Sequence, residues 1–250
     1  MIKRLKRVLF PVVLFTSSVV ALAASHPRSI RHHGTVIVKT VAHKSAAVVR
    51  SEEMMKVYDS LQLNATGLSE GAFFSALTGL QQLVAEGKLQ NDSIISIVDF
   101  SLPSTEKRLF VIDLNNKKLL FNTLVSHGRN SGLNNATSFS NRPNSFKSSL
   151  GFYITGQTYT GKHGLSLRLI GEERGINDNA ERRGIVMHSA DYVNDEWARG
   201  TGRIGRSEGC PAIPEEISDE VISAISNGSC LFLYSPDKFY LAHSRYISKA

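Results

Sequence analysis

The chain has 250 residues, of which 42% are hydrophobic, and it contains two cysteines. A chain of this size can bury a substantial core without crosslinks. The first 50 residues hold nine Lys and Arg and no acid, so setting them aside turns the formal net charge of +7 into −2 for the remaining body. A nucleic-acid-binding domain would carry a basic face within its fold, so we expect no nucleic-acid partner.

Residues 1–23 predict a cleaved signal peptide. Four basic residues precede an apolar run from Val8 to Val20, and Ala21-Leu22-Ala23 has the small-x-small pattern of a cleavage site. The apolar stretch is shorter than the ~20 residues of a membrane-spanning helix, so we expect no stable membrane span. The sequence therefore predicts an exported protein of the periplasm or cell envelope.

Residues 24–50 predict a flexible basic linker. Its five basic residues, without any acid, are typical of a solvated segment or of one that contacts an anionic envelope surface. Four histidines also fall here: His26, His32, His33 and His43. They lack the partners of a metal site, so we expect no metal.

Residues 51–90 predict a short helical support packed on the main domain. Ser51, followed by two acids, resembles the N-cap of a first helix with an apolar stripe. Ser69 predicts the N-cap of a second helix that runs to about Ala85, and Gly87 is placed to end it.

Residues 91–250 change to the pattern of strands. Apolar or alternating runs predict strands at Ile94–Phe100, Arg108–Asp113, Lys118–Val125, Gly151–Thr155, Leu165–Leu169, Gly184–His188 and Leu231–Tyr234. Asn115-Asn116 predicts a hairpin turn between the second and third of these. Residues 126–150 form a long polar loop of a kind that is more often functional than idle. Pro214 predicts the start of one C-terminal helix that ends near Ser226. The fold class is therefore mainly β with a few helices.

Cys210 is the strongest functional signal. Gly209 tolerates backbone angles that other residues avoid, and Pro211 restricts Cys210 to extended geometry, so the thiol is expected on a tight turn and accessible to a substrate. His188 lies 22 residues upstream, at the end of a predicted strand. A histidine near the thiol can take its proton and generate a nucleophilic thiolate.

The second cysteine raises the question of a disulfide, because disulfides form in exported proteins. Cys230 lies in the apolar run Ser229 to Tyr234 and is expected to be a small buried hydrophobic residue of a strand. A bridge between Cys210 and Cys230 would disable the proposed nucleophile.

The wider sequence resembles the L,D-transpeptidases (YkuD-like enzymes), which remodel bacterial peptidoglycan. The run Gly205-Arg206-Ser207-Glu208-Gly209-Cys210-Pro211-Ala212 is similar to a divergent branch, the murein L,D-transpeptidase catalytic domain family. Further similar segments lie at Val98–Ser101, Arg108–Leu114, Ser126–Gly128, Phe139–Asn141, Ser148–Phe152, Tyr159–Gly164 and Met187–Ala190. The resemblance covers roughly residues 52–235 and implies a β-sandwich-like catalytic domain over residues 91–250.

The chain departs from the usual family pattern at three points. The gap between His188 and Cys210 is longer than usual, Glu208 stands where the family often has a second His, and Ala212 stands where Asn is frequent. The residues themselves give no ground for choosing between an orienting role and a solvent-facing role for Glu208.

The resemblance implies acyl transfer through a cysteine thioester. Cys210 attacks the carbonyl of the third residue of a tetrapeptide stem, D-Ala leaves, and an amine of a second stem resolves the thioester into a 3-3 crosslink. His188 acts as the base and returns the proton to the leaving amine. The partners implied are peptidoglycan stem peptides, and no cofactor is implied.

Other residues are expected around this pair. Backbone N–H groups near Gly209 and Cys210 are candidates for an oxyanion hole. Arg206 is expected to hold a substrate carboxylate or, alternatively, to clamp a loop carbonyl. His127 is expected to line the cleft or to hydrogen-bond within its loop, and Ser207 and Ser189 complete the expected oxyanion and substrate set.

Three alternatives share these residues. In an L,D-carboxypeptidase, water replaces the acceptor amine; in a second alternative the stem is transferred to a protein. The third is a non-catalytic peptidoglycan-binding protein on the same scaffold, which the missing second His favours. Acylation of Cys210 by a carbapenem distinguishes the enzymes from the binder.

Overall fold

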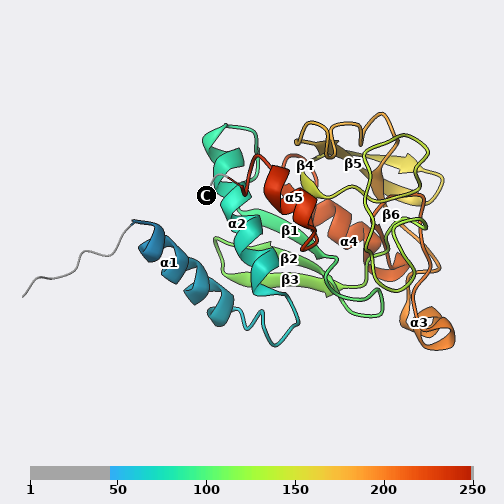
Figure 1. Ribbon diagram of the computed structural model, residues 1–250. Helices are drawn as coiled ribbons and strands as arrows, with labels where there is room; N and C mark the ends of the chain where they lie inside the picture. The colour runs from blue at the N-terminus through green and yellow to red at the C-terminus, as the bar shows by residue number, and fades with distance from the viewer. Residues whose placement is uncertain (1–45, 249–250) are drawn as a thin grey trace, which may run out of the picture. The chain divides into compact units, whose positions relative to one another are not determined.

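An eight-stranded mixed sheet forms the centre of the protein (Figure 1). The computed structural model describes residues 46–248, with side chains from residue 52, and all of them belong to one compact unit. The predicted signal peptide and residues 24–45 of the predicted linker lie outside the described residues. The strand order is β3-β2-β1-β8-β4-β5-β6-β7. The strands are β1 (Ile94–Asp99), β2 (Leu109–Asp113), β3 (Lys118–Thr123), β4 (Gly151–Gly161), β5 (Gly164–Gly171), β6 (Val186–Ser189), β7 (Ala212–Ile213) and β8 (Cys230–Tyr234).

The apolar runs of the sequence form the middle of this sheet. β1 and β8 pair in parallel, and every residue of both strands is buried, as expected for parallel strands covered on both faces. β2 and β3 form the predicted antiparallel hairpin beside β1. At the other edge, the short strands β6 and β7 pair in parallel. The predicted mainly-β fold is confirmed.

The helices are α1 (Ala46–Ser60), α2 (Glu70–Ala85), α3 (Asp195–Thr201), α4 (Glu215–Ile225) and α5 (Lys238–His243). α2 begins as predicted, because the Ser69 side chain accepts a hydrogen bond from Ala72 N–H at 3.2 Å. Its Gly79 allows close approach to the sheet, since a Cβ there would stand 2.0 Å from the Phe152 ring. α4 also follows the prediction and packs on β5 and β6.

Three helical features differ from the sequence prediction. α1 begins at Ala46 and not at Ser51, because the Ala and Val residues before Ser51 continue the helix. α3 and α5 were not predicted. Each is short and begins at a side-chain N-cap, Asn194 for α3 and Asp237 for α5. Helices of this length show no hydrophobic periodicity, so their formation depends on tertiary packing.

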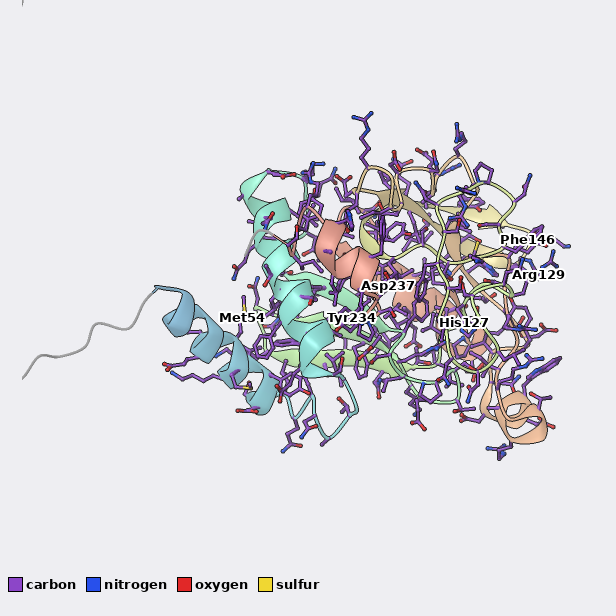
Figure 2. The ribbon with its side chains drawn as sticks, in the orientation of Figure 1. Met54, His127, Arg129, Phe146, Tyr234 and Asp237 are labelled. Carbon is purple, nitrogen blue, oxygen red and sulfur yellow. The ribbon has the colours of Figure 1, made fainter. Side chains whose placement is uncertain are left out.

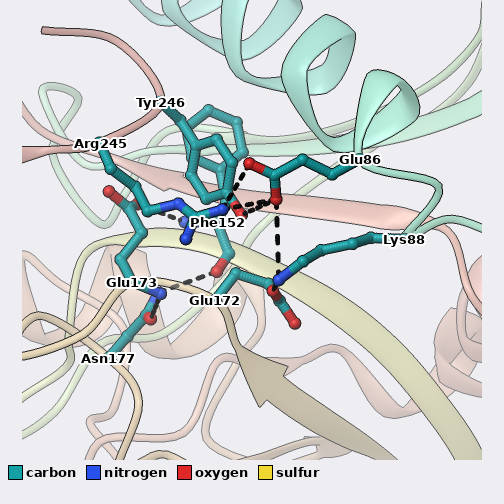
Figure 3. Close-up of polar contacts among 8 residues, drawn as sticks. All are labelled: Glu86, Lys88, Phe152, Glu172, Glu173, Asn177, Arg245 and Tyr246. Carbon is teal, nitrogen blue, oxygen red and sulfur yellow. Dashed lines mark hydrogen bonds and ion pairs between the residues drawn. The ribbon is translucent and has the colours of Figure 1, made fainter.

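The buried carboxylate of Glu173 fastens the C-terminal segment to the sheet. Figure 3 shows Glu173 with its neighbours Phe152 and Asn177. Glu173 is 1% exposed and accepts hydrogen bonds from Phe152 N–H at 2.9 Å, the Tyr240 hydroxyl at 3.0 Å and the Ser244 hydroxyl. Burial raises the pKa of Glu173 above its ordinary value. The three donors therefore depend on one desolvated acceptor.

Replacing this acceptor is expected to destabilise the fold strongly. Glu173→Ala leaves buried donors without a partner, and we expect a loss of about 3 kcal/mol in the free energy of unfolding, measured by urea denaturation. Glu86→Ala is the matched control, because Glu86 pairs with Arg245 at the partly exposed surface and should cost less than about 1 kcal/mol. Equal losses in the two variants would contradict the central role of Glu173.

Candidate functional site

Cys210 lies on a turn just before β7, and the residues on both sides fix its backbone. Gly209 has φ +126°, and a Cβ there would stand 2.8 Å from the Lys147 carbonyl oxygen, so the position requires glycine. The Ser207 hydroxyl donates to the Cys210 carbonyl at 2.6 Å and accepts from Gly209 N–H at 3.1 Å. The Gly209 N–H is thus occupied. The Cys210 N–H has no acceptor among residues 46–248, which makes it the available donor.

The Cys210 sulfur is partly exposed and is not in a disulfide; Cys230 is also free and is buried in β8, as predicted. Val186 N–H donates to Cys210 Sγ at 3.5 Å, and Sγ lies 3.7 Å from the Gly184 carbonyl oxygen. Burial raises the pKa of the Cys210 thiol, and the Val186 N–H and the Arg183 charge offset only part of this effect. The resting sulfur is therefore a neutral thiol.

His188 lies on β6 and is 8% exposed. Its Nδ1 is 2.7 Å from the Ser189 carbonyl oxygen. Because a carbonyl can only accept, Nδ1 carries the proton and Nε2 is left as the basic nitrogen. Burial lowers the pKa of His188, and the Ser189 carbonyl opposes this only in part, so the ring is neutral at neutral pH.

The sheet brings the two predicted catalytic residues onto neighbouring segments. His188 pairs with Ala212 across β6 and β7, which places Cys210 two residues before the strand partner of His188. No hydrogen bond joins Cys210 Sγ to the His188 ring in the part of the chain that the structure describes; Sγ faces the Gly184 carbonyl instead. Both groups are therefore neutral at neutral pH.

His163 supports His188 from the β4–β5 turn. The two rings stack with centroids 4.8 Å apart and an interplanar angle of 27°. The Ser189 hydroxyl donates to the His163 carbonyl at 2.7 Å, and the Ser189 carbonyl accepts from His188 Nδ1. Ser189 therefore contacts both the turn and the His188 ring. Neither contact is visible in the sequence, because residues 163 and 188 meet only through strand pairing.

Arg183 is an arginine whose charge acts on the Cys210 thiol, and no sequence motif pointed to it. One terminal nitrogen donates to the Ser140 carbonyl at 2.8 Å, and the other donates to the Lys147 carbonyl at 2.5 Å. Its positive charge lowers the pKa of Cys210. Arg183 thus fastens the long polar loop 126–150 beside the Cys210 turn.

Arg206 binds two carbonyl groups of the polar loop. Its Nη1 donates to the carbonyl oxygens of Arg129 and Gly132, both at 2.8 Å. These contacts correspond to the expected clamp on loop carbonyls, and the arginine charge that lowers the pKa of Cys210 is that of Arg183.

The structure does not bring His127 to the cleft. His127, which is labelled in Figure 2, is fully buried. Its Nδ1 lies 2.7 Å from Arg108 Nη2, and its ring stands edge-on to Phe100. Burial and the Arg108 charge lower the pKa of His127 to about 3, so it is a neutral acceptor. Its carbonyl accepts from Ser207 N–H at 3.0 Å, so it supports the Cys210 turn from behind.

Glu208 links the Cys210 turn to the polar loop. Its carboxylate lies 3.4 Å from Arg129 Nη1, and the Arg129 guanidinium lies 4.0 Å from the centroid of the Phe146 ring (Figure 2). Both charged side chains are largely exposed, so the ion pair contributes at most about 1 kcal/mol. The residue that replaces the second His of the usual pattern therefore forms an exposed bridge between two loops.

Within residues 46–248, no group of three or more His, Cys, Asp and Glu side chains is placed to hold a metal ion. None of the described helices combines the length and the apolar character needed to span a bilayer.

A family model described as "L,D-transpeptidase catalytic domain" matches residues 64–234, which include the sheet and the Cys210 turn. The chain belongs to the L,D-transpeptidase catalytic domain family. The match confirms the resemblance drawn from the motifs. No match was found among curated proteins.

Several solved structures show a distant likeness to this chain. An L,D-transpeptidase from Mycobacterium smegmatis is 13% identical with a TM-score of 0.36, over 57% of this chain and 59% of that one. L,D-transpeptidase 3 from Mycobacterium tuberculosis is 12% identical with a TM-score of 0.36, over 57% and 61%. The helical cell shape determining protein Pgp2 from Campylobacter jejuni is 14% identical with a TM-score of 0.37, over 58% and 49%. The chain thus matches less than two thirds of each of these proteins.

Proposed function

We propose that this L,D-transpeptidase family member is an exported cysteine acyltransferase that forms 3-3 crosslinks in peptidoglycan. The observation that carries the proposal is the hydrogen bond from His188 Nδ1 to the Ser189 carbonyl at 2.7 Å. It leaves Nε2 as the only basic ring nitrogen, on the strand next to the segment that holds Cys210. The predicted signal peptide supports action outside the cytoplasm.

The first half of the reaction forms a thioester. The Cys210 side chain rotates from the Gly184 carbonyl toward His188, whose Nε2 takes the thiol proton as Sγ attacks the carbonyl of the third stem residue. The Cys210 N–H stabilises the oxyanion. His188 then gives its proton to the amine of the departing D-Ala, and the carbon–nitrogen bond breaks to leave the thioester.

The second half reverses the roles of the two groups. An amine of another stem loses a proton to His188 Nε2 and attacks the thioester carbonyl. The carbon–sulfur bond breaks, and the sulfur regains its proton from His188. A new amide joins two third-position residues, and both catalytic groups return to their neutral resting forms.

Product analysis tests this function. The mature protein is incubated with purified disaccharide tetrapeptide, and the products are separated by mass. A crosslinked dimer together with free D-Ala is expected. A tripeptide product without any dimer would show that the protein is an L,D-carboxypeptidase, in which water is the acceptor, and not a transpeptidase.

A non-catalytic peptidoglycan-binding protein is the second candidate. The neutral thiol and the absence of a hydrogen bond between Sγ and the His188 ring in the described structure favour it. Intact-mass measurement after incubation with a carbapenem separates the two functions. One covalent adduct on Cys210 is expected of the enzyme, and an unmodified mass would favour the binder.

A further inference from the structure

A small pocket lies directly beside the Cys210 turn. Its volume is about 150 Å³, and its walls include Arg182, Arg183, Ile185, Phe146 and Glu208. A Cβ on Gly209 would stand 3.1 Å from Ile185 Cδ1 and 3.2 Å from Arg183 Nη2. The pocket therefore borders the residue that precedes the nucleophile.

One wall of the pocket is a strained piece of the polar loop. Phe146 has φ +53°, a left-handed conformation that bulky residues rarely adopt, and Asn144, a residue type that tolerates this region, has φ +55°. The Arg129 guanidinium packs on the Phe146 ring. Arg183 donates hydrogen bonds to the residues on either side of Phe146, the Ser145 hydroxyl and the Lys147 carbonyl. Strain of this kind persists where the surroundings fix it, and it is concentrated at ligand sites.

The charged groups of the pocket are not equally available. Both terminal nitrogens of Arg183 donate hydrogen bonds to the polar loop 126–150. Glu208 is paired with Arg129. Arg182 is exposed and has no hydrogen bond or ion pair with any of the described residues. The pocket therefore offers the unpaired guanidinium group of Arg182, and the hydrogen-bonded guanidinium group of Arg183 adds a second positive charge.

A guanidinium group at the edge of a small pocket fits a carboxylate, because its planar donors match the two oxygens. In a peptide attacked at its last amide bond, the terminal carboxylate is separated from the attacked carbonyl by only one residue. Such a carboxylate must lie close to Cys210 Sγ. A pocket of about 150 Å³ has room for one carboxylate and a small side chain.

We infer that this pocket binds the terminal carboxylate of the residue that leaves the donor stem, with Arg182 as the recognising cation. The inference rests on the proposed function and deepens it. It makes the protein selective for stems that end one residue after the attacked carbonyl, because longer stems place no carboxylate in the pocket.

Binding measured without turnover tests the inference. Cys210→Ala protein is titrated by calorimetry with a tetrapeptide stem that ends in a free carboxylate and with the same peptide as its C-terminal amide. We expect the acid to bind about five- to tenfold more tightly than the amide. Adding Arg182→Gln should remove this preference and leave the affinity for the amide unchanged, whereas Arg182→Lys should retain part of it.

Arg174→Gln is the matched control, because Arg174 is an exposed arginine of the same β5–β6 connection and does not line the pocket. It should leave the acid-to-amide ratio unchanged. An unchanged ratio in the Arg182→Gln protein, or an equal loss for both peptides, would overturn the inference. Loss of the ratio in a protein that makes no product would instead refute the proposed function and leave the carboxylate site standing.

Discussion

Cys210→Ala is expected to reduce thioester formation and crosslinking to background, a loss of at least about 10³-fold. The Ser207 hydroxyl of the same turn is held by the Cys210 carbonyl and the Gly209 N–H, and removal of a nucleophile leaves only binding and oxyanion stabilisation. The measurement is twofold: dimer formation from disaccharide tetrapeptide, and the mass of the protein after exposure to a carbapenem.

The fold should survive this substitution. The Cys210 sulfur is partly exposed, and its contacts with Val186 N–H and the Gly184 carbonyl are weak ones at 3.5 and 3.7 Å, so we expect a loss of about 1 kcal/mol or less in the free energy of unfolding. The turn itself is held by Ser207 and by the backbone of Gly209 and not by the sulfur.

Cys230→Ala is the matched control for the loss of a thiol. Cys230 is fully buried in β8, and burial raises the pKa of its thiol, so it is inert toward substrate and drug. Its replacement should lower stability by about 1–2 kcal/mol and preserve the crosslinking rate. Residual crosslinking in the Cys210→Ala protein, or its loss in the Cys230→Ala protein, would show that the nucleophile lies elsewhere.

The sequence predicts the elements whose cause is local. The parallel centre of the sheet follows from apolar runs such as Ile94–Asp99, and Ser69 begins α2 through its own side chain. The tight turn at Cys210 follows from Gly209 and Pro211, and the positive φ of Gly209 confirms that reasoning. Each of these features is decided by residues within a few positions.

The supports of the site could not be predicted in this way. Arg183 acts on residues about 40 positions earlier in the chain, and the stacking of His163 on His188 requires that β5 and β6 pair. His127 carries the same local signal, a histidine followed by glycine, as His163, but tertiary packing turns its ring toward Arg108. Local sequence identifies which residues can do chemistry, and only the fold decides which of them reach the same place.

The electrostatics give the site a particular resting state. Burial raises the pKa of Cys210 and lowers the pKa of His188, so the pair starts as thiol and imidazole and not as an ion pair. Thiolate then forms only when the proton moves to His188 during attack. A neutral resting thiol also resists alkylation and oxidation, which proceed through the thiolate.

His188→Ala is therefore expected to lower the rate of Cys210 acylation by about 10²- to 10⁴-fold, the usual contribution of a general base. The pH profile gives the sharper test. Because burial lowers the pKa of His188, the neutral base is present above that pKa, and the wild-type rate should fall only as pH drops below the ordinary histidine value of 6.5. Carbapenem acylation is the reaction to follow, since no acceptor amine titrates in it.

The variant should show a different dependence on pH, without the wild-type plateau in the neutral range. Without His188 the thiolate must form by direct ionisation, and because burial raises the pKa of Cys210 above its ordinary value of 9.0, the residual rate should climb with pH throughout the neutral range. His163→Phe is the matched control: it keeps a stacked ring beside His188 and removes a charge that lowers the pKa of His188, so its acid limb should move upward at a nearly unchanged plateau. A His188→Ala profile with the same acid limb as the wild type would assign the proton transfer to another group, because a merely structural His188 would change the rate without changing its dependence on pH.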